Sequence, residues 1–539
     1  MKRLLLIFAA CALGWATGCS GGGSSGPVTP PQSGFNNASL TGAYVFSLSG
    51  TTLDNTSGTS AFSRVGVFSA DGKGDILTTG GLEDVHMFGA QNIFGITGGS
   101  YSITSDGRGS LCIETSGGMV QYSISLVASS SGYMADMGTV TSCSSGGTLT
   151  NTETASGSFA LQTATSLATG TYTFDFSGIS PISGNAISRI GDFIPSAAGM
   201  GTFSSGSFED VNDGGNFTTK ADITGSYQPD NSSPGTGRGT AIINGLNYVY
   251  YVIDGQHAQF METDPDQVIA GTNAGEAVAQ QIGTPNNTSA FNSSSFVFVM
   301  GGSDSSFSPF TRGGRFTATG GSVASILLDE NDAGSSQSVP KSGVLSGGAI
   351  TLDGDNSGRG TLTFTDTVNN TGTYRFVFYL SSATQGVIQD VTTVQVGGVA
   401  TAVDVMDGTL LAQTGAPFTS GGLATAYSFD WSGANGNGEE DFVGSFAPAN
   451  TAPNGLVDYN EFGVGKLFLN TPFNGVFTIG GDGTSSTGQH STFVAGLSGT
   501  PAVTINYFAY IANPSTILIM GTQNNGARVI AGVLTAQTP

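Results

Sequence analysis

The chain has 539 residues, a formal net charge of −23 and only 10% charged residues. Average soluble proteins carry about 25% charged residues, and here 84 glycines and many Ser and Thr residues take their place. The negative field repels phosphate backbones, which excludes nucleic acid as a partner. A chain of this length exceeds the size of one hydrophobic core, so several domains are expected.

The N-terminus has the pattern of an export signal. Residues 2–13 form a basic start and an apolar run that is too short to span a bilayer. The stretch Ala16-Thr17-Gly18-Cys19 resembles the lipobox of bacterial lipoproteins. The resemblance implies that residues 1–18 are a signal peptide and that Cys19 carries the lipid that anchors the chain in the cell envelope, whereas an ordinary secretory signal is the alternative. Ser20 in place of an aspartate favours the outer membrane, and two acyl chains give a stable anchor.

Residues 19–39 are rich in Gly, Ser, Pro and Asn, which predicts a flexible stalk. Beyond the stalk, one aromatic pattern recurs at intervals of about 125 residues, which indicates a tandem repeat. Its copies are Tyr44-Val45-Phe46, Tyr172-Thr173-Phe174, Phe296-Val297-Phe298 and Tyr427-Ser428-Phe429. The spacing predicts four β units at 40–163, 164–285, 286–414 and 415–539. Gly-, Pro- and Asn-rich joints between them predict beads on a string with small contacts between neighbours.

The large apolar residues of the repeated pattern fall at every second position, the period of a strand with one buried face. Each unit has signals for about eight short strands with short connections, which predicts an all-β chain of antiparallel meanders. A closed barrel leaves no free edge and is the preferred fold, with a two-sheet sandwich as the alternative.

Two resemblances bear on these repeats. The openings Gly42-Ala43-Tyr44 and Gly170-Thr171-Tyr172 resemble the Gly-x-Trp opening of lipocalin-type (calycin) barrels, which implies a similar layout. The repeats are also similar to uncharacterised Gly/Ser-rich surface lipoproteins of acidobacterial type. That similarity implies a surface location and no particular activity.

Two arginines recur in the first three units. The first lies in an Arg-x-Gly-x-Phe strand, and its copies are Arg64, Arg189 and Arg312. The second lies in a Gly-Arg-Gly sequence, and its copies are Arg108, Arg238 and Arg359. Unit four has Phe442 at the first place and no Gly-Arg-Gly, so we interpret the two arginines as members of one local network. The glycine of the first motif is expected to leave room for an aromatic ring of the neighbouring strand.

Acidic residues supply the expected partners of these arginines, and they are Glu83, Asp84, Glu209, Asp210 and Glu330. By parity Arg64 faces the core with Phe68, and a buried cation needs a carboxylate because an unpaired buried charge is very costly. We interpret the set as an internal ion pair that closes one end of each unit. The alternative is a repeated ligand site in which the arginine binds an anion or a sugar.

The two remaining cysteines of the exported part, Cys112 and Cys143, both lie in unit one. An exported protein enters an oxidising compartment, so a disulfide is predicted between them. It would close a loop of about 30 residues and stabilise the unit by roughly 3 to 4 kcal/mol.

No catalytic residue, metal site or cofactor is assigned from the sequence. His86, His257 and His490 fall at unrelated positions of different units, which does not fit a repeated metal site or a catalytic triad. Asp353-Gly354-Asp355 begins like an EF-hand loop, but Phe364 stands at its twelfth position, so a turn is predicted instead.

Together these features favour a non-catalytic surface protein with an adhesion or binding role. Its expected partners are the membrane, through the lipid, and a glycan or an extracellular protein. One alternative is an array of β-barrels that bind small ligands or glycans. Another is a polysaccharide hydrolase that uses a pair of carboxylates.

Overall fold

The computed structural model describes residues 34–539 with gaps at 55–57, 145–146, 266–270, 282–287, 292–293, 334–340, 367–371, 397–398, 403, 449–453, 463–465, 481–489, 498–502 and 523–527. The predicted signal peptide, most of the stalk and Cys19 lie outside the described residues. Helical structure in the described part is limited to short 3-10 turns at Asn37–Ser39, Thr288–Phe291 and Ser420–Gly422. No helix described here is long and apolar enough to cross a membrane.

Each repeat forms a sheet of its own. Unit one contains β1 (Thr41–Asp54), β2 (Gly58–Asp71), β3 (Leu82–Met87), β4 (Ala90–Ile103), β5 (Arg108–Thr115), β6 (Gly118–Ala128), β7 (Ser131–Val140), β8 (Leu149–Thr150) and β9 (Glu153–Leu161). Unit two contains β10 (Tyr172–Ile179), β11 (Ala186–Phe193), β12 (Gly201–Thr202), β13 (Phe208–Asp213), β14 (Asn216–Asp222), β15 (Gly225–Pro229), β16 (Arg238–Ile243), β17 (Leu246–Asp254), β18 (His257–Glu262) and β19 (Asn273–Ala279).

The last two units follow the same order of strands. Unit three contains β20 (Ser294–Ser303), β21 (Pro309–Thr319), β22 (Ser322–Asp332), β23 (Lys341–Leu352), β24 (Arg359–Asp366), β25 (Gly372–Leu380), β26 (Gln385–Asp390), β27 (Thr393–Val396), β28 (Val399–Ala402) and β29 (Val405–Ala412). Unit four contains β30 (Tyr427–Asn435), β31 (Gly438–Phe446), β32 (Gly455–Glu461), β33 (Lys466–Thr478), β34 (His490–Leu497), β35 (Val503–Asn513), β36 (Thr516–Thr522) and β37 (Val529–Ala536).

The prediction of four tandem all-β barrel units is confirmed. Units three and four are closed barrels, and unit one closes through the pairs β6–β7 and β1–β9, with β8 added at the edge of β7. Unit two is a ten-stranded sheet in which β12 and β14 are the two edge strands. Its extra strand β12 lies between β11 and β13 in sequence and pairs with β15, so the described strands of this unit stop short of a closed ladder.

Each unit has its own core of inward-facing aromatic residues, as the alternation predicts. In unit two, Tyr172 stacks on Phe193 with ring centroids 5.3 Å apart, and Phe174 lies 4.6 Å from Phe176. In unit four, Trp431 is 1% exposed and stacks on Phe429 at 4.0 Å. These rings occupy the interior of the barrels.

The glycine of the Arg-x-Gly-x-Phe strand lies directly opposite a core phenylalanine in every unit. The pairs are Phe46 with Gly66, Phe174 with Gly191, Phe298 with Gly314 and Phe429 with Gly444. A Cβ added to Gly314 would lie 2.5 Å from Cζ of Phe298. The expectation that this glycine makes room for a neighbouring ring is therefore confirmed.

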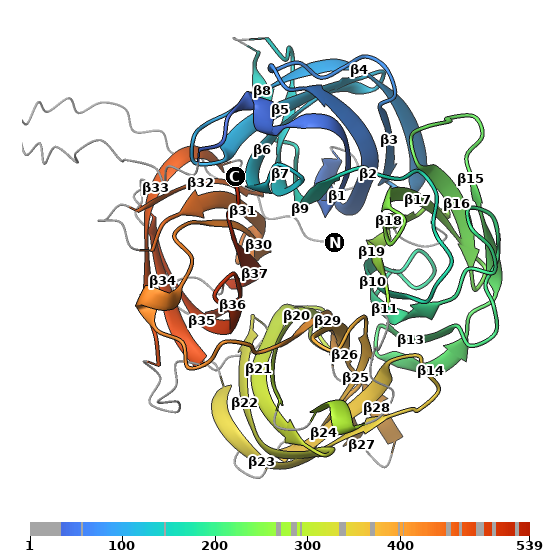
Figure 1. Cartoon of the computed structure of the whole chain (residues 1–539), viewed down its shortest axis with the longest axis vertical. Coiled ribbons are helices and arrows are strands. Elements are labelled where there is room, and N and C mark those ends of the chain that lie inside the picture. The colour runs from blue at the N-terminus through green and yellow to red at the C-terminus, as the bar shows by residue number, and fades with distance from the viewer. Residues whose placement is uncertain are drawn as a thin grey trace, which may run out of the picture.

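The four units form a ring, with unit four beside unit one and an open centre between them (Figure 1). Small apolar clusters bridge every junction: Val65 with Tyr251 between units one and two, Ile190 with Tyr379 between two and three, Val297 with Tyr510 between three and four, and Met137 with Val443 between four and one. The expectation of beads on a string is wrong. Several outward-facing side chains on the first two strands of a unit, such as Val65 and Val297, are apolar. Each unit buries such side chains against its neighbour.

The predicted disulfide is present between Cys112 on β5 and Cys143 after β7, with Cα atoms 5.5 Å apart. Ser100 of β4 donates a hydrogen bond to the Cys143 carbonyl at 3.0 Å. The bridge therefore ties the loop after β7 to the neighbouring pair β4–β5 of unit one.

The glycine opposite the core ring gives a direct test of the packing. We expect Gly314→Ala to lower the free energy of unfolding by about 1 to 3 kcal/mol, because the added methyl group meets Phe298 and the Leu327 carbonyl. Gly301→Ala is the matched control in the same barrel, since nothing lies within 4 Å of its added Cβ. Urea unfolding followed by circular dichroism measures both, and equal losses would contradict this account.

Candidate functional site: buried links and a central cavity

The first repeated arginine lies inside its own unit and is paired there. Arg64 of β2 contacts Glu83 of β3 at 2.9 Å and Glu153 of β9 at 3.1 Å. Arg189 of β11 donates to Oε2 of Glu209 from Nε at 3.1 Å and from Nη2 at 2.6 Å. All five side chains are buried. Each of these two predicted pairs thus lies inside its own barrel, between the second strand of the barrel and the strand that pairs with it.

Unit three makes the same kind of pair with more carboxylates. Arg312 of β21 donates from Nε to Glu330 at 2.8 Å and from Nη2 to Asp404 at 3.0 Å, and it also contacts Asp390. Its guanidinium lies 5.2 Å from the ring centre of Tyr374. The site is an arginine enclosed by acidic and aromatic side chains.

Unit four replaces this pair by aromatic packing. Phe442 stands opposite Trp431 on the neighbouring strand, as Arg312 stands opposite Met300. The Phe442 ring stacks on Tyr459 at 5.0 Å. This unit has a different buried pair, in which Arg528 donates to Glu440 at 2.8 Å.

The second repeated arginine crosses to the preceding unit. Arg238 of unit two binds Asp84 of unit one through two parallel contacts of 2.7 and 2.8 Å. Arg108 of unit one reaches Asp458 of unit four at 3.4 Å and so closes the ring. The two arginines of a unit therefore do not share one network, which corrects that expectation. Glu83 faces its own core while the adjacent Asp84 faces the neighbour, because successive side chains of a strand point to opposite sides.

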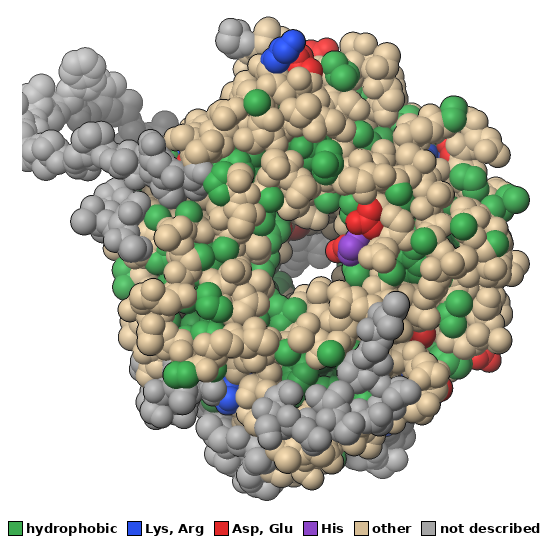
Figure 2. Space-filling model, in the orientation of Figure 1, with side chains coloured by type: hydrophobic (Ala, Val, Ile, Leu, Met, Phe, Trp, Pro, Cys, Tyr) green, Lys and Arg blue, Asp and Glu red, His purple; other side chains and the backbone are tan. Residues whose placement is uncertain are grey.

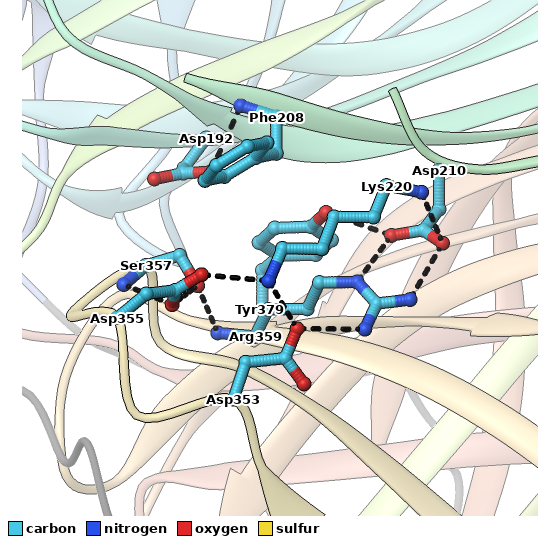
Figure 3. A network of polar contacts seen from close by, with 9 residues as sticks. All are labelled: Asp192, Phe208, Asp210, Lys220, Asp353, Asp355, Ser357, Arg359 and Tyr379. Carbon is cyan, nitrogen blue, oxygen red and sulfur yellow. Dashed lines mark hydrogen bonds and ion pairs between the residues drawn. The ribbon is translucent and has the colours of Figure 1, made fainter. Parts of the chain in front are cut away.

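Figure 3 shows the same arrangement between units two and three. Arg359 holds Asp210 through Nε and Nη2 at 2.7 and 2.8 Å, and the Tyr379 hydroxyl donates to the same carboxylate at 2.7 Å. Asp353 accepts from Arg359 at 3.0 Å and from Lys220 of unit two at 2.7 Å. The EF-hand-like segment is thus a turn whose first carboxylate holds cations of this chain.

A repeated Asp-x-Asn sequence on the third strand is the signal that the sequence analysis missed. Its aspartates occupy one register position in all four units, and they are Asp84, Asp210, Asp329 and Asp458. Two residues later the asparagines donate across the junctions to backbone carbonyls, Asn212 to Asp404, Asn331 to Gly521 and Asn460 to Glu153. Unit one has His86 at this place. Aligning unit three on Asp329 instead of Glu330 would have revealed the motif.

A glutamine after the last strand of every unit adds a further link. These side chains donate to backbone carbonyls of the following unit, Gln162 to Val252, Gln280 to Ser357, Gln413 to Ile511 and Gln537 to Leu126. Unit four makes this contact with unit one, so the ring is closed by the same chemistry that joins consecutive repeats.

The junction between units three and four differs from the other three. Tyr510 donates to Asp329 there, and Asn331 and Gln413 make their usual contacts. In units two and three, Arg238 and Arg359 each stand opposite a tyrosine of the next strand. In unit four, His490 takes the place of the arginine and stands opposite Tyr510. Among the described residues this junction has no arginine–aspartate pair.

All six predicted arginines are thus bound by carboxylates of this chain. Each is buried, and none has its guanidinium directed at open solvent. For the first arginine the geometry agrees with the interpretation as an internal ion pair, whereas the second arginine pairs with a carboxylate of another unit, which the sequence did not predict. An anion or sugar would have to displace a buried carboxylate to reach either arginine.

An open space lies at the centre of the ring, where the molecular surface is hollowed between the units (Figure 2). A cavity of about 830 Å³ is lined by residues of all four units, among them Thr51, Ile187, Phe310 and Leu518. A second cavity of about 300 Å³ lies between units two and three and shares Ser177 with the first. The first and last strands of the units surround this space.

Carboxyl groups line this centre, and no Lys or Arg is among the described residues that line it. Asp407 of β29 accepts hydrogen bonds from Ser177 and Ser188, and burial raises its pKa to about 6. It faces Asp175 of β10, whose pKa is raised well above its usual value by burial and by the Asp407 charge. Two like charges in one site favour protonation of at least one of them.

A second group of carboxyls lies where unit four meets unit one. Burial raises the pKa of Asp441 to about 7, although Thr154 and Ser156 of unit one donate hydrogen bonds to it. Asp430 and Glu439 line the large cavity nearby, and burial and the Asp441 charge raise the pKa of both well above the usual values. These carboxyls are candidates for binding because perturbed pKa values in a cavity mark functional sites.

The three histidines lie apart. His86 is fully buried on β3, and its burial lowers its pKa. His257 is half-exposed and pairs with Asp254 at 2.8 Å. His490 begins β34 in unit four. Within the described ranges no group of three His, Cys, Asp or Glu side chains is placed to hold a metal ion.

Comparisons with known proteins complete the description of the site. No protein-family model matches the sequence, and no curated protein matches it either. Kievitone hydratase from Nectria haematococca is a similar solved structure at 8% identity and a TM-score of 0.21, covering 48% of this chain and 92% of that chain. Transferrin binding protein B from Haemophilus parasuis, as a double mutant, reaches 11% identity and a TM-score of 0.19, with 76% and 83% covered. Such TM-scores do not establish a shared fold, and they carry no conclusion about function.

The junction carboxylate gives a second test. We expect Asp210→Asn to destabilise the chain by about 3 to 5 kcal/mol, because it leaves the buried guanidinium of Arg359 without its main partner. Asp222→Asn on exposed β14 of the same unit is the control and should change stability by less than about 0.5 kcal/mol. Calorimetric unfolding measures both, and a loss for Asp210→Asn no larger than that of the control would refute the proposed strength of the link.

The central carboxyls predict a pH dependence of stability. In the unfolded chain Asp407 and Asp441 ionise near pH 4, whereas in the ring their pKa values are about 6 and 7. Between about pH 4 and 7 the folded state therefore holds protons that the unfolded state has released, so the free energy of unfolding falls as pH rises through this window. The neighbours Asp175, Asp430 and Glu439 act in the same direction.

Asp441→Asn tests this sign. The amide cannot ionise, so the variant should lose about 1 to 3 kcal/mol less than the parent protein between pH 5 and pH 8. Urea unfolding at the two pH values gives the difference. Parallel pH dependences of variant and parent would show that this carboxyl is not titrating in the folded ring.

Proposed function

We propose that the chain is a lipid-anchored protein of the cell envelope that acts by binding and does not catalyse a reaction. The observation that carries this proposal is how the repeated polar residues are used. The repeated arginines are bound by carboxylates of the chain itself, and the barrel interiors are filled by aromatic rings. The surfaces left for partners are the loops and the central cavity.

The anchor and the stalk support an extracytoplasmic location. Cys19 would carry the lipid, and residues 20–33 would separate it from the first described residue of the ring. Ser20 favours sorting to the outer membrane or the cell surface. On this proposal the ring is held near the membrane at one point, while its loops face a glycan or an extracellular protein.

The central cavity favours a second candidate, the binding of a small ligand. The sequence suggested one ligand in each barrel, whereas the cavity of about 830 Å³ lies between the units. A single site would then be shared by four units. A screen of glycans and small molecules against the full-length chain separates this candidate from a purely adhesive role, and turnover of a polysaccharide in the same screen would point to a hydrolase.

The anchor can be tested directly. We expect Cys19→Ser to remove the lipid attachment and move the protein from the membrane fraction to the soluble fraction, without changing its unfolding midpoint. Metabolic labelling with a radioactive fatty acid and fractionation of cells measure this. Alanine in place of Ser20 is the control and should stay labelled; a labelled Cys19→Ser protein would overturn the anchor.

A further inference from the structure

We propose that the central cavity binds an extended organic cation in which protonated amino groups are separated by methylene carbons, as in a polyamine. This inference rests on the second candidate function above, the binding of a small ligand in the cavity, and names its chemistry. Three features of the cavity support it: its charges, its unsatisfied acceptors and its apolar walls.

The ionisable side chains of the cavity walls are all acidic. Asp175 and Glu276 line the smaller space, and Asp407, Asp430 and Glu439 line the larger one, and no Lys or Arg is among the lining residues of either. Ser177 and Thr409 line both cavities, so their acidic walls are adjacent, and together they form an acidic tract contributed by several units. A cation that enters this tract favours the ionised form of these carboxyls over the protonated form, and it is attracted to them in a region of lowered dielectric.

Some of these carboxyl oxygens have no donor in the folded chain. Oδ1 of Asp175 and Oδ1 of Asp430 are buried and without a hydrogen-bond partner. The other contacts in the tract come from hydroxyl groups, Ser177 and Ser188 to Asp407, Thr51 to Glu439 and Ser156 to Asp430. A buried acceptor without a donor costs free energy, and an ammonium group supplies up to three N–H donors together with the opposite charge.

Part of the wall of the large cavity is apolar. Ile187, Phe310, Leu518 and Val529 contribute to it. Phe307 lies at the same cavity and keeps 61% of its surface exposed. Methylene segments between amino groups would cover such surface, and aromatic faces also attract ammonium groups.

The positions of the carboxyls on separate strands favour an extended cation over a compact one. They are contributed by β10, β19, β29, β30 and β31, that is, by three different units. A compact ion can contact only neighbouring oxygens, whereas a chain with several amino groups can reach carboxyls on separate strands. An extended polyamine therefore satisfies more of the acceptors than a single small cation does.

The experiment is calorimetric titration of the full-length chain in neutral detergent with spermidine at near-physiological salt. The cavity variant is Asp407→Asn with Asp430→Asn, and the matched control is Asp75→Asn with Asp222→Asn, which removes the same charge from exposed positions. We expect spermidine to bind the parent and the control equally, within about twofold, and to bind the cavity variant at least tenfold more weakly. Circular dichroism checks that both variants fold.

Several outcomes would overturn the inference. If the control loses as much affinity as the cavity variant, the binding is only general attraction to an acidic surface. If magnesium binds as tightly as spermidine and is lost in the cavity variant, the ligand is a compact ion. If a neutral oligosaccharide binds the parent and not the cavity variant while spermidine does not bind, the cavity is a ligand site but the cation assignment is wrong. Absence of binding by all three also removes support for the small-ligand candidate, and the anchored surface role then rests on the Cys19 test alone.

Discussion

Asp84, Asp210 and Asp458 are buried carboxylates on the outer face of the third strand, and each lies in the junction with the following unit. A carboxylate in such a place is tolerated only if a cation or several donors meet it. The following unit supplies an arginine from a fixed place, the first residue of the strand after its Gly-rich turn. At two of these junctions the tyrosine directly opposite the arginine also donates to the carboxylate. This requirement fixes how each barrel is turned against the next, and the ring follows from its repetition.

Apolar contacts alone would not set this geometry. The clusters at the junctions consist of a few valine, isoleucine, methionine and tyrosine side chains, and apolar packing has little directional preference. The arginine forks, the asparagines and the glutamines point to single carbonyl or carboxylate oxygens, so they specify one orientation. The last unit makes such contacts with the first, which converts a linear repeat into a closed assembly.

The charged side chains of this protein occupy two kinds of environment. The six repeated arginines are placed where carboxylates are buried, inside the barrels and at the junctions. At the centre of the ring, carboxyls are brought together with no lysine or arginine among the described lining residues, and burial shifts their pKa values upwards. A structural role needs the first arrangement, in which each buried carboxylate is paired with an arginine. The second costs free energy at neutral pH, and a ligand that brings positive charge would offset that cost.

The sequence by itself determined the elements. Local periodicity and sterics account for the alternation of aromatic residues, the four copies and the glycine opposite a phenylalanine. The barrels, their number and their aromatic cores could therefore be predicted. The disulfide followed from there being only two cysteines to pair in the exported part of the chain. Even the pairing of Arg64 with Glu83 could be anticipated, because strand parity places both on the inner face.

Only the tertiary structure decided which carboxylate meets the second arginine and where the open space lies. Arg108 and Asp458 are 350 residues apart, and no periodicity links positions that meet only when the ring closes. The central carboxyls belong to outward faces that look solvent-exposed in a single unit. They become a cavity because four such faces converge, and that convergence is set by the orientation of whole barrels, which local sequence patterns do not encode.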